Sequence, residues 1–272
     1  MSKHKLLGVK PKSGEAQRLQ QSLLDYHHYR HEHRSPQSDR TQAVAALQAV
    51  QMARLTETHK DLIESPRYHE ALVFLLNDLY APKNLMQRDA DLERIFPKIV
   101  KLLPQKLLGV MADLTDLNML TQQLDDRLLD ALAEDFAALI KPTTDSEPRE
   151  TGLAARIAGL SQGEYAAAFR RCDNKDARQR QIQLTRTLGL ELERYVTSRS
   201  ILFALQISEG AAEMAGLAEL HGFLMRGFTA FRNMGGVAEL LDIVSNRESA
   251  LLEHLYSHDA ETLRHMEKPF KL

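Results

Sequence analysis

The stretch PQKLLGVMADLTDLNMLTQQLDDRLLDALAEDFAALI, residues 104–140, decides the fold class of this chain. Its large apolar residues recur every three or four positions, which is the spacing of one face of an α-helix. Pro104 suits a helix start, because proline has no N–H and the first N–H of a helix makes no hydrogen bond within the helix. An apolar face of this length has to be covered, so the stretch predicts a long helix within a helical bundle. The face comprises Leu107, Val110 or Met111, Leu114, Leu117, Leu120 or Thr121, Leu124, Leu128, Leu132, Phe136 and Leu139.

The same spacing recurs on both sides of this stretch, and we find no period-two alternation and no Asn-Gly hairpin. We therefore predict an all-α protein of about ten helices, in one or two antiparallel bundles. Further helices are expected over 15–33, from 39, after Ser65-Pro66, over 88–103 with a kink or break at Pro97, and in four stretches after 160, of which two are long: 173–206 and 208–232.

The segment KPTTDSEPRETG, residues 141–152, predicts the main domain boundary. It holds two Pro and one Gly and has little apolar surface to bury. We expect an N-terminal helical half over 1–140 and a C-terminal half over 153–256. Residues 257–272 are expected to form a loosely attached tail.

Composition restricts the class of protein. Hydrophobic residues make up 43% and charged residues 26% of the chain, as in ordinary globular proteins. A net charge of −2 argues against a protein that coats nucleic acid. The single Cys172 allows no internal disulfide and fits a reducing compartment. Because we see neither a secretory signal nor a membrane-spanning apolar run, we expect a cytoplasmic protein without a membrane partner.

The stretch YHHYRHEHR, residues 26–34, concentrates histidines at the end of a predicted helix. His27 and His31 lie four positions apart, so their rings face the same way and can ligate one metal ion. Two ligands alone do not make a site. We therefore favour a solvated, pH-responsive helix end and keep a metal site as the alternative.

Charged residues also gather in NDLYAPKNLMQRDADLERIFP, residues 77–97. We expect Arg–Asp pairs to hold this loop between two helices. The alternative is a site for an anionic ligand, where Arg88 and the N–H groups at the start of the next helix converge.

The penultimate helix places His221 on the same apolar face as Phe228 and Phe231. We expect a hydrogen-bonded core histidine there, with a ligand contact as the alternative. Several glycines thin out this region, which favours close helix packing over a gap for an apolar ligand: Gly210, Gly216, Gly222, Gly227, Gly235 and Gly236. In the last helix, Arg247 and Glu248 interrupt an apolar stripe, so their charges have to be paired.

Three segments carry a resemblance to a known family: VFLLNDLYAPKNLMQRDADLERIFP (73–97), RQRQIQLTRTLGLELERYV (178–196) and LHGFLMRGFTAFRNMGGVAELLDIVSNRE (220–248). Together they resemble an uncharacterised bacterial all-helical protein family over roughly residues 65–256. The resemblance implies a helical fold and no particular activity. The matching positions to consider as a site are Asp78, Tyr80, Arg88, Asp89, Arg232, Arg247 and Glu248.

No phosphate-binding glycine loop, nucleophile elbow or His-Glu-x-x-His motif occurs in the chain. We therefore predict a regulatory or protein-interaction protein without catalytic activity or cofactor, which pairs with a second copy or another protein. The first alternative is a small-molecule sensor or carrier with an apolar pocket near His221, Phe228 and Phe231. The second is a metal-dependent helical enzyme that uses His27 and His31. Nucleic-acid binding is the least favoured.

Overall fold

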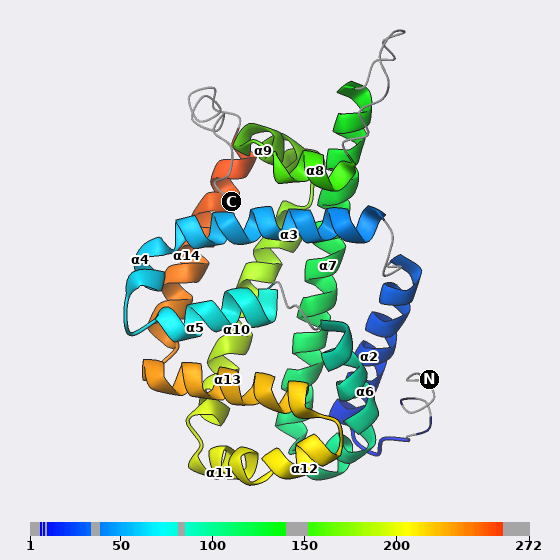
Figure 1. Cartoon of the computed structure of the whole chain (residues 1–272), viewed down its shortest axis with the longest axis vertical. Coiled ribbons are helices and arrows are strands. Elements are labelled where there is room, and N and C mark those ends of the chain that lie inside the picture. Colours follow the sequence, from blue (N-terminus) through cyan, green and yellow to red (C-terminus); the bar gives the residue numbers. More distant parts are fainter. Residues whose placement is uncertain are drawn as a thin grey trace. The chain divides into compact units, whose positions relative to one another are not determined.

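The computed structural model describes residues 6, 8, 10–33, 39–80, 85–139 and 152–257 (Figure 1). Within these ranges every regular element is a helix, so the predicted all-α class is confirmed. Among the described helices, none combines the length and the apolarity that a membrane crossing requires. The elements are α2 (Gly14–His33), α3 (Asp39–Thr58), α4 (Lys60–Glu64), α5 (His69–Phe74), the π-helix η1 (Leu75–Tyr80), α6 (Leu85–Leu102), α7 (Gln105–Leu139), α8 (Leu153–Ala158), α9 (Gln162–Arg171), α10 (Lys175–Val196), α11 (Arg199–Ile207), α12 (Glu209–Met214), α13 (Ala218–Met234) and α14 (Ala238–Tyr256).

Several helix ends follow local signals in the sequence. Ser161 accepts a hydrogen bond from the backbone N–H of Glu164, whose carboxylate accepts one from the N–H of Ser161, which is a capping box for α9. Gly235 ends α13 in the left-handed conformation, with φ of 74°. Pro97 lies inside α6, which continues on both sides of it.

Two helices that the sequence predicted as continuous are divided. The predicted helix 173–206 stops at Val196, because Ser198 leaves the helical conformation and caps α11 by accepting a hydrogen bond from Ile201. The predicted helix 208–232 is divided into α12 and α13. Gly216 lies between them with φ of 66°, a conformation that suits glycine.

The chain forms two compact units. Unit 1 comprises Met1–Glu32, Asp61–Met119 and Leu184–Ile243, and unit 2 comprises His33–Lys60, Leu120–Gln183 and Val244–Leu272. Three of the boundaries between the units fall inside helices α7, α10 and α14, and the predicted halves, 1–140 and 153–256, stay a prediction. The predicted linker, except for Gly152, and the predicted tail, except for Ser257, lie outside the described residues.

The core of unit 2 lies around the second half of α7. The apolar face predicted there is buried at Leu124, Leu128, Leu132 and Phe136. Helix α3 packs against α8 in the same unit. The core residues are Ala43, Val44, Leu47, Val50, Leu128, Leu129, Leu132, Phe136, Ile157, Leu160, Tyr165, Ala166, Ala168, Phe169, Leu252 and Leu255.

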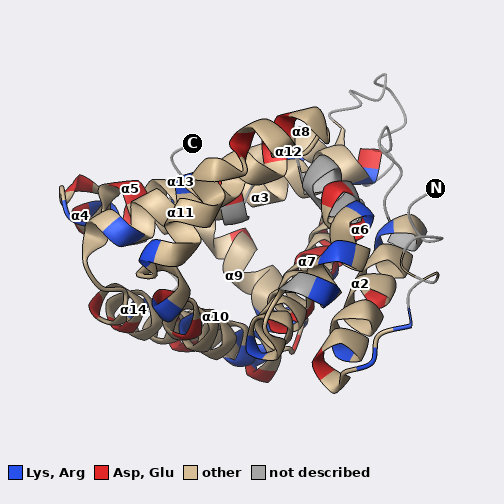
Figure 2. Ribbon diagram, turned by 90° about the horizontal axis from the view of Figure 1, so that it is seen from below, with Lys and Arg blue, Asp and Glu red and all other residues tan. Residues whose placement is uncertain are grey.

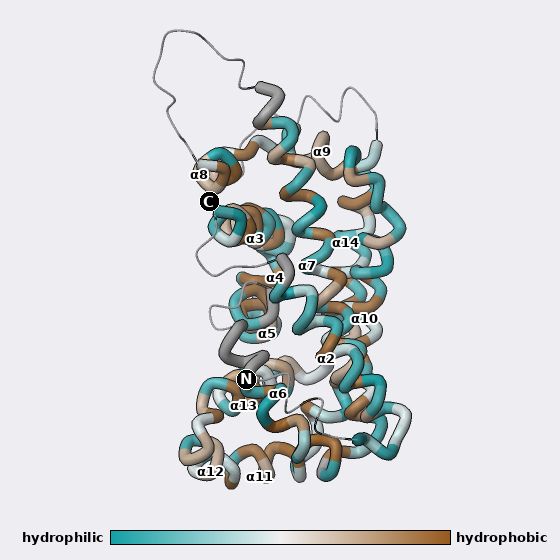
Figure 3. The backbone as a smooth tube through the Cα atoms, turned by 90° about the vertical axis from the view of Figure 1, so that its right-hand side faces the viewer, coloured by the Kyte–Doolittle hydropathy of each residue, from teal (hydrophilic) through white to brown (hydrophobic). Residues whose placement is uncertain are grey.

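Unit 1 has a core between α2, α6 and the first half of α7. It consists of Leu6, Ala16, Leu19, Leu23, Phe96, Ile99, Leu108 and Ala112. Elsewhere in the same unit, α13 lies between α5 on one side and α11 and α12 on the other (Figures 1 and 3).

Gly227 permits the close approach of α13 to α5. A Cβ atom at Gly227 would lie 2.6 Å from Cζ of Phe74. The ring of Phe74 is held in turn between Phe223 and Phe231, with centroid distances of 5.3 and 5.9 Å. Close helix packing, the role favoured from the sequence, is therefore what this glycine provides.

Replacing Gly227 with Ala is expected to lower the free energy of unfolding by about 1–2 kcal/mol. Overpacking against a held ring costs about 1–3 kcal/mol, and the better helix propensity of Ala offsets up to about 1 kcal/mol. Gly210→Ala is the matched control, because nothing lies within 4 Å of a Cβ at Gly210. Urea denaturation measures both variants. If Gly227→Ala is as stable as the parent protein, the ring of Phe74 moves aside without an energetic cost.

Candidate functional site

Helix α11 has an unusual sequence for a helix that stays at the surface. Its residues, RSILFALQI, include a single charge and are apolar on nearly all sides, a pattern typical of a buried helix. In the structure, however, no residue of α11 or α12 is buried. The brown tube of α11 in Figure 3 shows how apolar this exposed segment is.

Four large apolar side chains are exposed on α11, α12 and α13. Phe203 is 63% exposed, Ile207 66%, Met214 87% and Leu224 44%. No other large hydrophobic residue of the described chain is as open to solvent. We call these four residues the α11–α12 face. It was missed from the sequence, because periodicity identifies an apolar face and does not show whether another element covers it.

Polar contacts from α13 and α6 hold α11 and α12 in place. The Nε2 atom of His221 on α13 lies 2.8 Å from the carbonyl oxygen of Leu205 on α11. Arg94 on α6 donates to the carbonyl oxygen of Gly216, which follows α12. The helices that carry the α11–α12 face are therefore held in position by hydrogen bonds to α13 and α6. Most residues of the two helices are neither acidic nor basic (Figure 2), the exceptions being Arg199, Glu209 and Glu213.

Glu248 forms ion pairs within unit 2, whereas Arg247 is hydrogen-bonded to a backbone carbonyl oxygen. Arg54 on α3 donates two hydrogen bonds to the carboxylate of Glu248, at 3.0 and 2.8 Å. Nε2 of His59 lies 3.0 Å from the same carboxylate, and Arg247 donates to the carbonyl oxygen of Thr58. This buried cluster ties the end of α3 to α14.

Burial alone would raise the pKa of Glu248, because water stabilises a carboxylate better than the protein interior does. The hydrogen bonds from His59 and Arg54, with the positive charge of Arg54, reverse this effect and lower the pKa to about 2. The carboxylate is therefore ionised at neutral pH and cannot serve as a proton donor there.

Asp78 of η1 also pairs with an arginine. Its Oδ1 accepts hydrogen bonds from Nε and Nη2 of Arg226 on α13, at 3.1 and 2.6 Å. Arg226 was not predicted as the partner. The side chains of the neighbouring predicted site residues, Tyr80, Arg88 and Asp89, lie outside the described residues. A site for an anionic ligand around Arg88 therefore stays a prediction.

His221, Phe228 and Phe231, around which an apolar pocket was predicted, lie on α13. Phe228 is buried, and the ring of Phe231 makes an edge contact with Phe74. His221 is hydrogen-bonded, as expected, but half-buried rather than in the core. Arg232 lies one turn beyond Phe228, with its Nη1 atom buried. Aromatic rings occupy the space beside Gly227, and a sensor function at this place stays a prediction.

A model of a protein family matches residues 29–262, and its description is a domain of unknown function, DUF8198. The chain belongs to this family. The match confirms the resemblance noted in three segments and extends it over both units. No curated protein and no solved structure matches the chain.

The histidine pair of α2 lies at the start of the DUF8198 match, with His27 before it and His31 inside it. The two rings are 4.3 Å apart between centroids, and Nδ1 of His27 lies 3.0 Å from Oε1 of Glu93 on α6. His27 is therefore less solvated than predicted, with 14% of its side chain exposed, whereas His31 is exposed. Partial desolvation of its ring lowers the pKa of His31, and the neighbouring His27 lowers it further.

A metal site needs a third ligand that converges with the two histidines. In the part of the DUF8198 domain that the structure describes, no three His, Cys, Asp or Glu side chains form such a group. Glu93 pairs with His27 as a hydrogen-bond partner. A metal-dependent enzyme at His27 and His31 thus stays a prediction without geometric support from the described residues.

Proposed function

We propose that this DUF8198 domain is a protein-interaction protein that pairs with a second copy of itself through the α11–α12 face. One observation carries the proposal: a helix with the sequence of a buried helix has no buried residue, and its Phe203 and Ile207 are exposed. Contiguous apolar patches on globular proteins mark interaction sites, because leaving them in water is unfavourable. The proposal assigns the domain a role in regulated association in the cytoplasm, and it assigns no reaction.

The exposed area favours a second copy as the occupant. If each large apolar side chain carries roughly 200 Å² of accessible surface, the four exposed fractions leave about 500 Å² open on each copy. Two copies related by a two-fold axis would then bury about 1,000 Å² through these residues alone, near the lower limit for a specific interface. A two-fold interface requires a self-complementary surface, and an apolar patch meets this requirement.

Charge does not oppose the pairing. The helices α11 and α12 carry only Arg199, Glu209 and Glu213, so two facing copies bring few like charges together. Phe203 is the aromatic residue of the face, and aromatic side chains dominate the energy of many interfaces.

Introducing Asp at both Phe203 and Ile207 is expected to weaken the dimer at least about 100-fold, because two desolvated carboxylates replace two apolar contacts. Light scattering coupled to gel filtration, over a range of protein concentrations, measures the mass. The parent protein should show twice the chain mass, and the double variant the chain mass alone. Because α11 contributes no buried residue, the variant should keep its helical circular-dichroism spectrum.

Thr229→Asp provides the matched control. Thr229 is exposed on α13, five residues beyond Leu224 and therefore turned away from the face, so the added charge should leave the dimer intact. A parent protein that stays monomeric at all concentrations would contradict the proposal. So would a dimer that persists in the double variant.

A further inference from the structure

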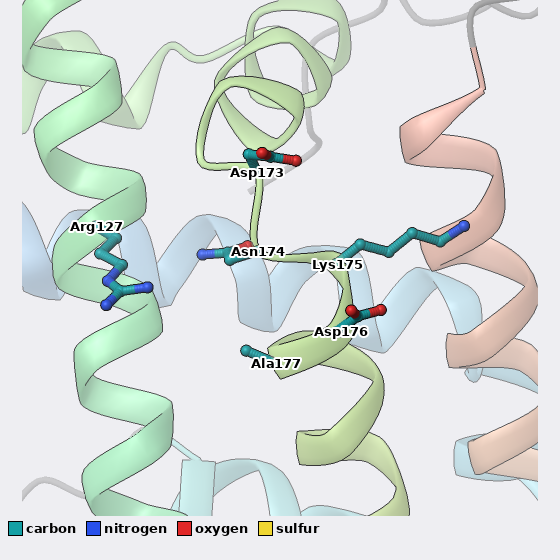
Figure 4. A pocket seen from close by; sticks show the side chains of 6 residues that line it. All are labelled: Arg127, Asp173, Asn174, Lys175, Asp176 and Ala177. Atoms are coloured by element: carbon teal, nitrogen blue, oxygen red, sulfur yellow. The ribbon is translucent and has the colours of Figure 1, made fainter.

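A pocket of about 420 Å³ opens at the start of α10, within unit 2 (Figure 4). The pocket lies between the loop that follows α9, the first turn of α10 and the middle of α7. We call it the α10 pocket. Its lining residues are Arg127, Asp173, Asn174, Lys175, Asp176 and Ala177.

Asn174 brings an unused hydrogen-bond donor to this pocket. The residue is only 7% exposed. Its Oδ1 lies 3.2 Å from the hydroxyl of Tyr256, and its backbone N–H donates to the same hydroxyl. The amide nitrogen Nδ2 is buried and has no hydrogen-bond partner among the described residues, and Figure 4 shows it directed toward Arg127. Buried donors without acceptors are rare, so the geometry points to an acceptor that a ligand supplies.

Arg127 supplies a positive charge on the opposite wall. Its side chain is exposed and forms neither an ion pair nor a hydrogen bond with any described residue. In Figure 4 its guanidinium points into the space that Asn174 faces. The first-turn N–H groups of α10 border the same space. They have no acceptor within their own helix and lie at its positive end.

The acidic residues are placed on the other side. The carboxylates of Asp173 and Asp176 lie toward Lys175, away from Arg127 (Figure 4). Lys175 in turn pairs with Glu253 at 2.7 Å. The pocket therefore has one wall of donors and another of acceptors. A ligand that fits both combines an anionic group with neutral hydroxyls, because a carboxylate accepts hydrogen bonds from hydroxyls and repels a second anion.

We propose that the α10 pocket binds the phosphate group of a small hydroxylated phosphate monoester. The tetrahedral group accepts from the guanidinium of Arg127, from Nδ2 of Asn174 and from the first turn of α10. The hydroxyls of the ester donate to Asp173 and Asp176. This ligand site lies apart from the α11–α12 face in the sequence and is independent of the proposed association.

The test is isothermal titration of the full chain with glycerol 3-phosphate and with inorganic phosphate, at low salt. The parent protein should bind glycerol 3-phosphate more tightly than inorganic phosphate, because only the ester donates to the carboxylates. Arg127→Gln should weaken the binding of both at least about 10-fold, because a charged partner of the phosphate is lost. Arg127 is exposed, so this change should leave the fold intact.

Arg180→Gln is the matched control. Arg180 is exposed on α10 and does not line the pocket, so removing its charge should leave both affinities unchanged. Absence of binding to the parent protein, or an equal loss in both variants, overturns the site. Equal affinities for the ester and for inorganic phosphate overturn the assignment to a hydroxylated monoester.

Discussion

Replacing Glu248 with Gln is expected to lower the free energy of unfolding at pH 7 by about 3 kcal/mol. The pKa of Glu248 falls from its usual 4.5 to about 2 in the folded protein. Each pKa unit corresponds to about 1.4 kcal/mol of stabilisation of the ionised form, which gives a loss of roughly 3 kcal/mol when the charge is removed. The glutamine would also leave the guanidinium of Arg54, which is 16% exposed, without its counter-charge.

The effect of this substitution depends on pH with a definite sign. Because the folded pKa lies below the unfolded one, the carboxylate contributes its full stabilisation above about pH 4.5. The contribution is lost as the pH falls from there through about 2, where the folded protein also becomes protonated. The parent protein and Glu248→Gln should therefore differ by a constant amount from about pH 7 to 5 and converge in more acidic solution.

Urea denaturation at several pH values measures this difference. Glu253→Gln is the control on the same helix, because Glu253 is 64% exposed and its pair with Lys175 is a surface ion pair. Its removal should change the free energy of unfolding by less than about 1 kcal/mol. A difference between the parent protein and Glu248→Gln that stays constant down to about pH 2 would show that the carboxylate is not the group responsible.

Replacing Phe96 with Ala is expected to cost about 3–5 kcal/mol, the loss typical of a fully buried phenylalanine. The side chain of Phe96 is 0% exposed and lies in the core of unit 1, among residues of α2, α6 and α7. Truncation removes apolar contacts and leaves a cavity that the surrounding helices fill only in part.

The same urea experiment at neutral pH measures the effect of Phe96→Ala. Lys98→Ala is the control, because Lys98 is exposed on the same helix, two residues away, and should change the stability by less than about 0.5 kcal/mol. A loss below about 1 kcal/mol for Phe96→Ala would mean that the core of unit 1 repacks around the smaller side chain.

Much of the local structure could be predicted from the residues. Leu124, Leu128 and Leu132 were expected on a packed face of a long helix, and all three are buried. The cap at Ser161 and the stop at Gly235 follow from hydrogen bonds and backbone preferences within a few residues. These signals depend on residues that are close together in the chain, so they can be recognised in the sequence alone.

The candidate sites could be predicted only in part. The sequence showed that Glu248 needs a positive partner, but Arg54 lies 194 residues earlier in the chain and no local rule selects it. The partner of Asp78, Arg226, is 148 residues away. The α10 pocket combines Arg127 with Asn174, and neither residue belongs to a recognisable motif.

The sequence by itself determined that this protein is helical and where several of its helices begin and end, because caps, breakers and apolar periodicity act between neighbouring residues. Only the tertiary structure decided which apolar surface is left uncovered and which distant charges meet. The helix at 199–207 is apolar enough to be buried, yet its exposure depends on which helices pack against it. Packing of that kind depends on contacts between residues far apart in the chain, which short-range patterns do not specify.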